Sequence, residues 1–148
     1  MRFVKHFLKI FLLIFGKPVN EVKILKNARF LGLFALGGSA YVGMELLWRG
    51  RSHPSMFAAG GLCFLLLGKL RETRLPDPMK PMAGAGIITA VELGTGLFVN
   101  RDYRVWDYRR LPMNYRGQIC LPFSLLWVPV SMLGMALYGL AEKIWESR

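Results

Sequence analysis

The chain lacks the sequence motifs of most soluble enzymes: it contains no P-loop, no dinucleotide-binding glycine pattern and no nucleophile elbow. Its two cysteines form no C-x-x-C motif and its two histidines form no H-x-x-x-H motif, so we expect neither a metal site nor a bound cofactor. Because 148 residues leave no room for a soluble ATPase or kinase module, we expect a single domain whose energy source lies elsewhere. These absences weigh against an enzyme.

Acidic residues are scarce as well, with nine Asp and Glu against twenty Lys and Arg and a net charge of +11. The basic residues flank apolar runs instead of forming a separate arm, which favours anionic lipid headgroups over nucleic acid as the partner. Hydrophobic residues make up 53% of the chain and the mean hydropathy is +0.34. The composition therefore predicts an integral membrane protein that binds no nucleic acid.

Four apolar runs predict transmembrane helices, so we expect an all-α fold over residues 29–148. Residues 30–48, 82–99 and 119–141 each have the 18 or more residues that a hydrocarbon core of about 30 Å requires. The fourth run, residues 56–70, is shorter and would have to begin in the preceding loop, tilt little or lie in a thinned bilayer.

Residues 1–28 differ, because Lys5, His6 and Lys9 interrupt their apolar content and Gly16 and Pro18 end the run early. We expect a basic amphipathic helix in the headgroup region, followed by a linker. A cleaved signal peptide is the alternative, which the absence of a small-residue cleavage site disfavours.

The distribution of Lys and Arg predicts the orientation. Thirteen lie before residue 30, in the connection at 69–80 or in the C-terminal tail, and seven lie in the other two loops. The positive-inside rule then places both termini in the cytoplasm of a multi-pass protein of the inner or plasma membrane.

A carboxylate in the middle of the run 82–99, Glu92, is costly in lipid and suggests a function. Glu45 lies near the outward end of the first run, and each glutamate is followed by an arginine-bearing loop and a Gly-x-x-Cys motif. The pattern predicts two helical hairpins related as parallel repeats. Structural alternatives remain for both: Glu92 can lock the bundle through a hydrogen bond or ion pair, and Glu45 can snorkel to the interface.

Unusual polar and aromatic residues gather at the end of the predicted bundle that carries the arginine-rich loops. We expect substrate or ion binding at Glu45, Arg49, Arg51, His53, Glu92, Thr95, Asn100, Arg101, Trp106, Asp107, Tyr108, Asn114 and Ser124. The aromatic members, together with Trp48, Trp127 and Tyr115, also fit a belt at the membrane interface. Cys63 and Cys120 fit buried free thiols better than a disulfide.

The second half carries a specific succession of motifs. After Glu92 it contains a W-D-Y, P-x-N, G-x-I-C, F-S-x-x-W progression at Trp106-Asp107-Tyr108, Pro112, Asn114, Gly117, Ile119, Cys120, Phe123, Ser124 and Trp127. In these residues the chain resembles the ABC-transporter permease type IV family, over roughly residues 35–135. The resemblance implies a small polytopic membrane protein involved in transport and identifies no substrate.

The favoured hypothesis is a transport protein, a permease or channel-like subunit, whose intramembrane carboxylates bind substrate, cation or proton near the outer face. Four short helices enclose little space, so we expect a homo-oligomer, most simply a dimer, with membrane lipids and a separate subunit as further partners. The alternative is an accessory protein whose Arg- and Trp-rich outer loop recognises a lipid headgroup, glycan or protein. An intramembrane enzyme using Glu92 or His53 ranks last, because no paired nucleophile and base is evident.

Overall fold

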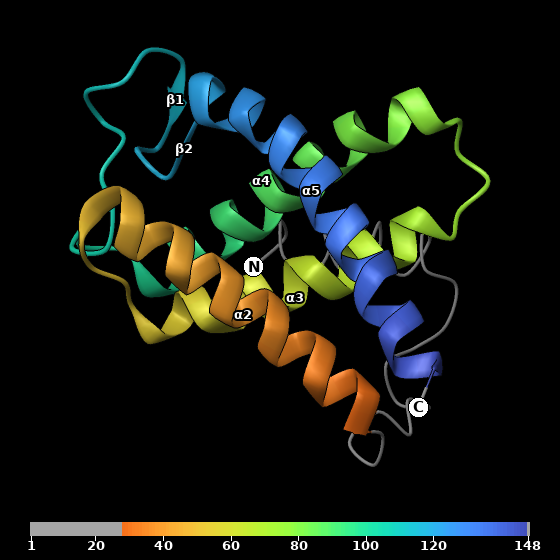
Figure 1. The fold of residues 1–148 in the computed structure, drawn as a ribbon. Coiled ribbons are helices and arrows are strands. Elements are labelled where there is room, and N and C mark those ends of the chain that lie inside the picture. Colours follow the sequence, from red (N-terminus) through yellow and green to blue (C-terminus); the bar gives the residue numbers. More distant parts are fainter. Residues whose placement is uncertain (1–27, 148) are drawn as a thin grey trace.

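The four apolar runs are four helices in the computed structural model, which describes residues 28–147 (Figure 1). The helices are α2 (Ala28–Arg49), α3 (Pro54–Arg71), α4 (Lys80–Val99) and α5 (Leu121–Glu146), with a short 3-10 helix, η3 (Asp77–Met79), before α4. The helical prediction is confirmed for each run. The predicted interfacial helix in residues 1–28 lies outside the described residues except for Ala28, the first residue of α2.

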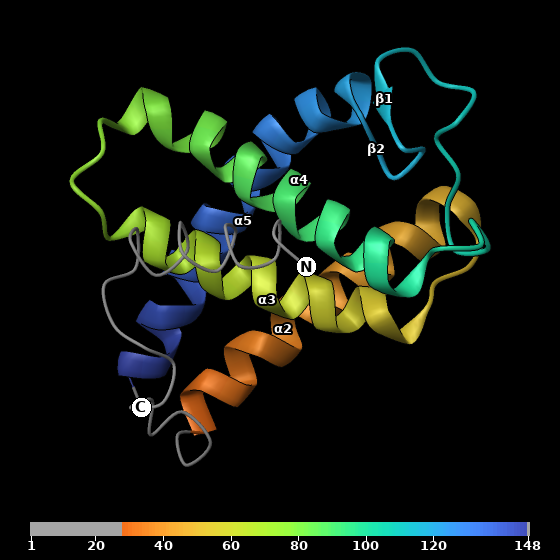
Figure 2. The same cartoon turned by 180° about the vertical axis from the view of Figure 1, so that it is seen from behind.

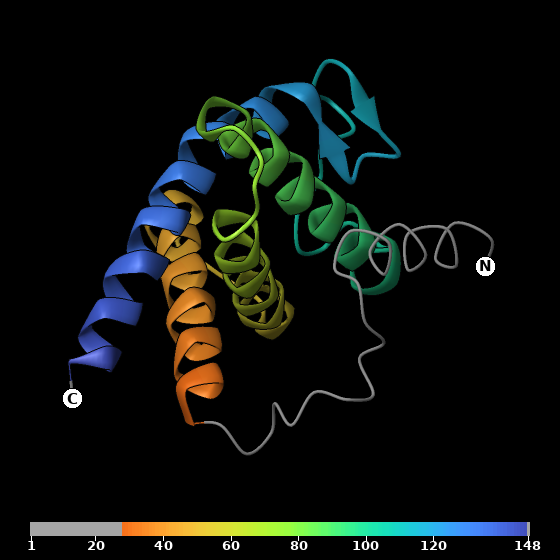
Figure 3. The same ribbon diagram turned by 90° about the vertical axis from the view of Figure 1, so that its right-hand side faces the viewer.

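Prolines mark where three of the helices begin. Pro54, Pro81 and Pro122 each lie in the first turn, where the missing N–H is not needed for an intrahelical hydrogen bond. Pro122 therefore lies in the first turn of α5 and does not bend the helix. Pro129, in contrast, lies in the interior of α5. An internal proline removes one helical hydrogen bond, and α5 changes direction along its length (Figure 3).

The helices form two hairpins, α2 with α3 and α4 with α5, and α3 contacts all three other helices. Figure 1 shows α2 and α5 in front, and the opposite view in Figure 2 shows α3 and α4 in front. By length and composition three segments of the described chain are able to cross a membrane: Arg29–Arg49, Asp77–Val99 and Leu121–Trp145. The shorter α3 ends in Lys69 and Arg71, and half of its residues are buried by its neighbours, so it is the inner helix of the fold.

Small residues let α2 and α3 approach closely. A Cβ built on Gly37 would overlap Phe64 of α3 and lie 3.0 Å from the Gly60 carbonyl oxygen, and one on Gly38 would lie 2.6 Å from the Phe57 carbonyl oxygen. Glycine contacts of this kind are a common way for membrane helices to pack backbone against backbone. The larger side chains of the core, including Leu67, lie where α3 meets α4 and α5.

Charged residues join three helices at the end of the molecule opposite the long loop. Glu142 of α5 forms ion pairs with Arg29 of α2 and with Arg71 of α3, the second at 3.5 Å. The two chain segments farthest apart in the described sequence are thereby fastened together.

The long loop between α4 and α5 contains the one β ladder of the described residues, which the all-α prediction did not include. Strands β1 (Asn114–Tyr115) and β2 (Ile119–Cys120) pair antiparallel, with Tyr115 opposite Ile119. Three residues separate Tyr115 from Ile119, and the Gln118 N–H donates to the Tyr115 carbonyl oxygen at 3.0 Å. The two central residues of this turn, Arg116 and Gly117, have φ of 52° and 64°, the left-handed backbone of a type I′ turn. Because residues 119 and 120 belong to this ladder, the last helix begins at residue 121 and not at 119.

The packing of α2 on α3 predicts the outcome of two alanine substitutions on the same helix. Gly37→Ala should lower the free energy of unfolding by about 1–3 kcal/mol, because the new methyl group has no room against Phe64. Gly43→Ala, where no atom lies within 4 Å of the added Cβ, should leave stability unchanged or raise it slightly. Thermal unfolding in mild detergent measures both, and equal melting temperatures would contradict the packing described.

Candidate functional site

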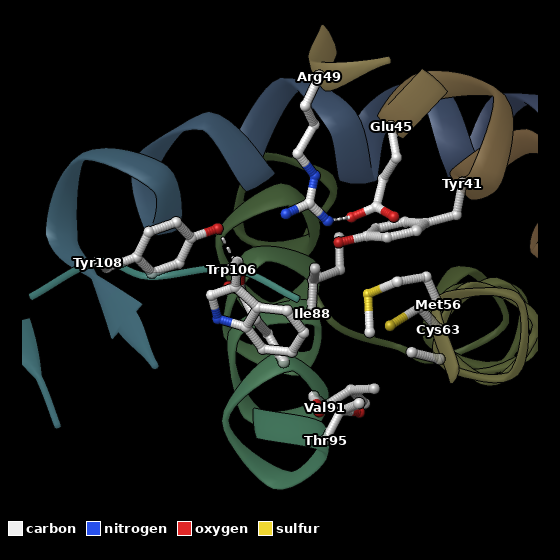
Figure 4. A pocket seen from close by; sticks show the side chains of 12 residues that line it. Tyr41, Glu45, Arg49, Met56, Cys63, Ile88, Val91, Thr95, Trp106 and Tyr108 are labelled. Atoms are coloured by element: carbon white, nitrogen blue, oxygen red, sulfur yellow. Dashed lines mark hydrogen bonds and ion pairs between the residues drawn. The ribbon is translucent and has the colours of Figure 1, made fainter. Parts of the chain in front are cut away.

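A small, partly open cavity lies among α2, α3, α4 and the long loop, and six of the predicted site residues line it (Figure 4). These six are Glu45, Arg49, Glu92, Thr95, Trp106 and Tyr108. The space is about 20 Å³, which is room for about one water molecule. The structure thus brings both intramembrane carboxylates to one small site.

Glu92 is held by two neutral hydrogen-bond donors. The Tyr108 hydroxyl donates to Oε1 at 2.8 Å, and the Trp127 indole N–H donates to Oε2 at 3.0 Å. The residue is only 8% exposed, and no Lys or Arg nitrogen of the described residues lies within ion-pair distance of it. Burial and the neighbouring carboxylate raise the pKa of Tyr108 above its ordinary value, so the phenol keeps its proton and remains a donor.

Glu45 is in the opposite situation, because its charge is neutralised locally. Arg49, one turn further along α2, forms an ion pair with it, and the Ser52 hydroxyl donates to Oε2 at 2.6 Å. Arg49 also donates to the Val105 carbonyl oxygen at 2.7 Å. The pair therefore closes the cavity by joining the end of α2 to the long loop.

The loop itself is built around Asn100, whose side chain is fully buried. Its amide donates to the Trp106 carbonyl oxygen at 2.6 Å and to Gln118 Oε1 at 3.1 Å, and its oxygen accepts from the Val105 N–H at 2.9 Å. Gln118 returns a hydrogen bond to the Asn100 carbonyl oxygen, and the Trp106 indole donates to the Gln118 carbonyl oxygen. Asn100 thus positions the loop over the cavity and does not line the cavity.

The remaining predicted residues lie elsewhere. Arg51 and Arg101 are exposed, His53 accepts from the Ser55 N–H as the N-cap of α3, and Asn114 bonds carbonyl oxygens of its own loop. Ser124 faces a separate hollow between α4 and α5. The small cavity therefore brings together six of the thirteen predicted residues, and the other seven lie outside it.

Asp107 is an exposed residue paired within its own loop. Arg109 donates to both of its carboxylate oxygens, at 2.9 and 2.7 Å, and these hydrogen bonds lower the pKa of Asp107 to about 2. A depressed carboxyl pKa means that the charged pair is present above that pH and is lost as the pH falls through it. Asp107 accordingly shapes the loop surface and does not reach the cavity.

The structure also corrects the belt interpretation for two tryptophans. Trp106 and Trp127 are buried and donate hydrogen bonds inside the protein, whereas Trp48 is 76% exposed and suits a membrane interface. Cys63 lines the cavity and Cys120 lies in β2, and both are buried free thiols.

Sequence reasoning missed Tyr41, Met56 and Gln118. Tyr41 lines the cavity from α2 and lies one helical turn before Glu45, a spacing that places the two on the same face and was available as a signal. Met56 and Gln118 had no comparable signal, since one is an ordinary apolar residue and the other is the variable position of the G-x-I-C motif.

The family model described as "Putative ABC-transporter type IV" matches residues 51–146. The chain belongs to this family. The matched range contains Glu92, the long loop and α5, and it begins after Glu45 and Arg49. The match confirms the resemblance found in the sequence motifs. No curated protein and no solved structure matched the chain. The family and the membrane-length helices together describe a membrane protein related to transport, a class that is usually not enzymatic.

The buried amide network predicts how the loop responds to truncation. Asn100→Ala leaves the Val105 N–H and Gln118 Oε1 without their buried partner, which costs about 1–3 kcal/mol for each unsatisfied group. We expect faster tryptic cleavage at the loop arginines and a lower melting temperature. Asp102→Ala, which removes an exposed ion pair with Arg104 and an exposed 3.4 Å hydrogen bond from the Arg104 backbone N–H, is the control and should change little. Equal cleavage rates in the two variants would show that Asn100 does not hold the loop.

Proposed function

We propose that the protein is a membrane transport subunit in which Glu92 binds a proton or a small cation. The observation that carries the proposal is that Glu92 contacts two neutral donors and no cation of the described residues, whereas Glu45 beside it has Arg49. An ionised carboxylate buried without a cation is costly in a membrane interior. Taking up a proton or a cation neutralises it, so the site gains free energy from binding either.

The size of the cavity favours a proton or a dehydrated monovalent cation as the species bound at Glu92. A space of about 20 Å³ accommodates a water-sized species but no organic substrate. The other oxygens at this site are those of Tyr41, Glu45, Thr95 and Tyr108. Such a site suits the coupling ion of a transporter better than a bulky cargo.

The assembly and orientation extend this proposal. Because the space beside Glu92 among the described residues is only about 20 Å³, we place the pathway at the interface of a two-fold homodimer, with both termini cytoplasmic and the long loop on the outer side. A separate ATPase subunit is the partner that the family description suggests. In this arrangement α3 is a fourth spanning helix, since its neighbours shield its short apolar segment from lipid.

The long loop, which the Asn100 hydrogen bonds hold in place, supports a second candidate function: an accessory protein that binds an anionic partner outside the membrane. Arg101, Arg104, Arg109, Arg110 and Arg116 are all exposed on a loop whose core is fixed by Asn100. A rigid arginine-rich surface suits recognition of phosphate or carboxylate groups. This candidate predicts that no ion movement accompanies binding and that Glu92 is dispensable.

Glu92→Gln decides between the two candidates. In the purified protein we expect a pH-dependent infrared carbonyl band of one protonated carboxylic acid to disappear in the variant, because the amide cannot take up the proton. In liposomes the variant should lose the ion flux that the native protein shows under an imposed gradient.

The matched control is Glu72→Gln, which removes an exposed carboxylate paired with Lys69 at the opposite end of the fold. It should keep both the band and the flux. A Glu92→Gln protein that folds and retains native flux would overturn the proposal, and a native protein without flux that still binds a partner through its loop would favour the accessory function.

A further inference from the structure

A groove runs between α2 and α5 and is separate from the small cavity. Two adjoining hollows of about 370 and 210 Å³ share five lining residues, so they are successive parts of one groove. The shared residues are Tyr41, Met44, Trp127, Val130 and Leu133. Volumes of this size are typical of sites that hold small molecules.

The groove exists because α2 and α5 touch at one end and separate toward the other (Figure 1). At the charged end, Glu142 binds Arg29, and Trp145 lies against Gly32. Toward the long loop the two helices diverge, and the floor of the groove is formed by side chains such as Phe64 and Leu67 of α3.

The groove opens sideways, where a membrane would surround the protein. Leu133 on the α5 wall is 71% exposed and Trp48 on the α2 wall is 76% exposed, although both line the hollow. An occupant can therefore enter from the bilayer without passing through water.

The two ends of the groove differ in polarity. Along most of its length the lining is aliphatic or aromatic, whereas Glu45, Arg49 and Tyr108 line the end next to the long loop. The loops at that end, residues 50–53 and 100–120, carry six arginines against two aspartates. An apolar channel that leads to a positively charged end matches an amphiphile with an anionic head.

We propose that this groove binds one acyl chain of an anionic glycerophospholipid, with the phosphate headgroup at the loop end beside Arg49. The acyl chain packs between α2 and α5 where the two helices do not touch. The negative charge of the headgroup offsets part of the excess positive charge of the loop arginines. The lipid also lies directly behind the small cavity, since Tyr41, Glu45, Arg49 and Tyr108 line both spaces. The proposal does not depend on ion binding at Glu92.

The test uses phosphatidylglycerol that carries a photoreactive diazirine in mid-chain, added to the native protein in lipid nanodiscs. After illumination, mass spectrometry should locate the label on groove residues such as Met44 and Leu137 in excess of exposed residues outside the groove such as Leu46 and Leu140. Phosphatidylcholine with the same chains should label the groove less, because its headgroup is zwitterionic.

Filling the groove is the matched mutational test. Ala40→Phe, on an exposed position that lines the groove, should reduce groove labelling to the level of the residues outside it. Ala35→Phe adds the same side chain at an exposed position of α2 outside the groove. In this variant the labelling of the groove residues should equal that in the native protein. Leu133→Trp on the opposite wall provides a second blocking variant.

Each result decides the proposal. Labelling that concentrates in the groove, falls in both blocking variants and favours phosphatidylglycerol supports it. Labelling spread evenly over all exposed apolar residues, or unchanged in Ala40→Phe and Leu133→Trp, overturns it. Equal labelling by phosphatidylcholine overturns the anionic headgroup. Groove residues that stay unlabelled while exposed residues outside the groove are labelled, as expected if a second copy of the chain covers the groove, overturn the lipid as occupant.

Discussion

The carboxylate of Glu92 is the constraint on which the loop end of the molecule depends. A charge buried in an apolar helix needs hydrogen-bond donors, and here one comes from the long loop and the other from α5. Both donors must therefore be held in place. The loop is fixed by the Asn100 amide network, and α5 is fixed by its packing on α3 and α4. The hydrogen bonds of Glu92 thus connect α4 to both the long loop and α5.

The two glutamates show how environment separates residues that look equivalent in the sequence. Glu45 has an arginine one turn away and a serine hydroxyl, so its charge is satisfied by its own hairpin. Glu92 has no such neighbour and relies on uncharged donors from distant segments. The arginine of the first pair instead reaches across to the loop and helps to enclose the second glutamate.

Much of the fold follows from apolar runs, because helices in lipid must satisfy their own backbone and so keep to recognisable lengths. The ends and the site are harder to predict. Residues 119 and 120 read as the start of a helix, yet their backbone pairs with β1, a tertiary contact that hydropathy does not report. The sequence likewise predicts a membrane-interface position for Trp106 and Trp127. Only the fold shows that their indole N–H groups have hydrogen-bond acceptors inside the protein.

The ion pairs of Glu142 have a geometric consequence. Because α2 and α5 are fastened at one end, their separation at the other end depends on the angle between them. The 22 residues of α2 span about 33 Å at about 1.5 Å per residue, so a rotation of about 5° displaces the far end by about 3 Å. A small difference in that angle therefore sets the width of the groove next to the long loop, at the end of α2 that carries Glu45.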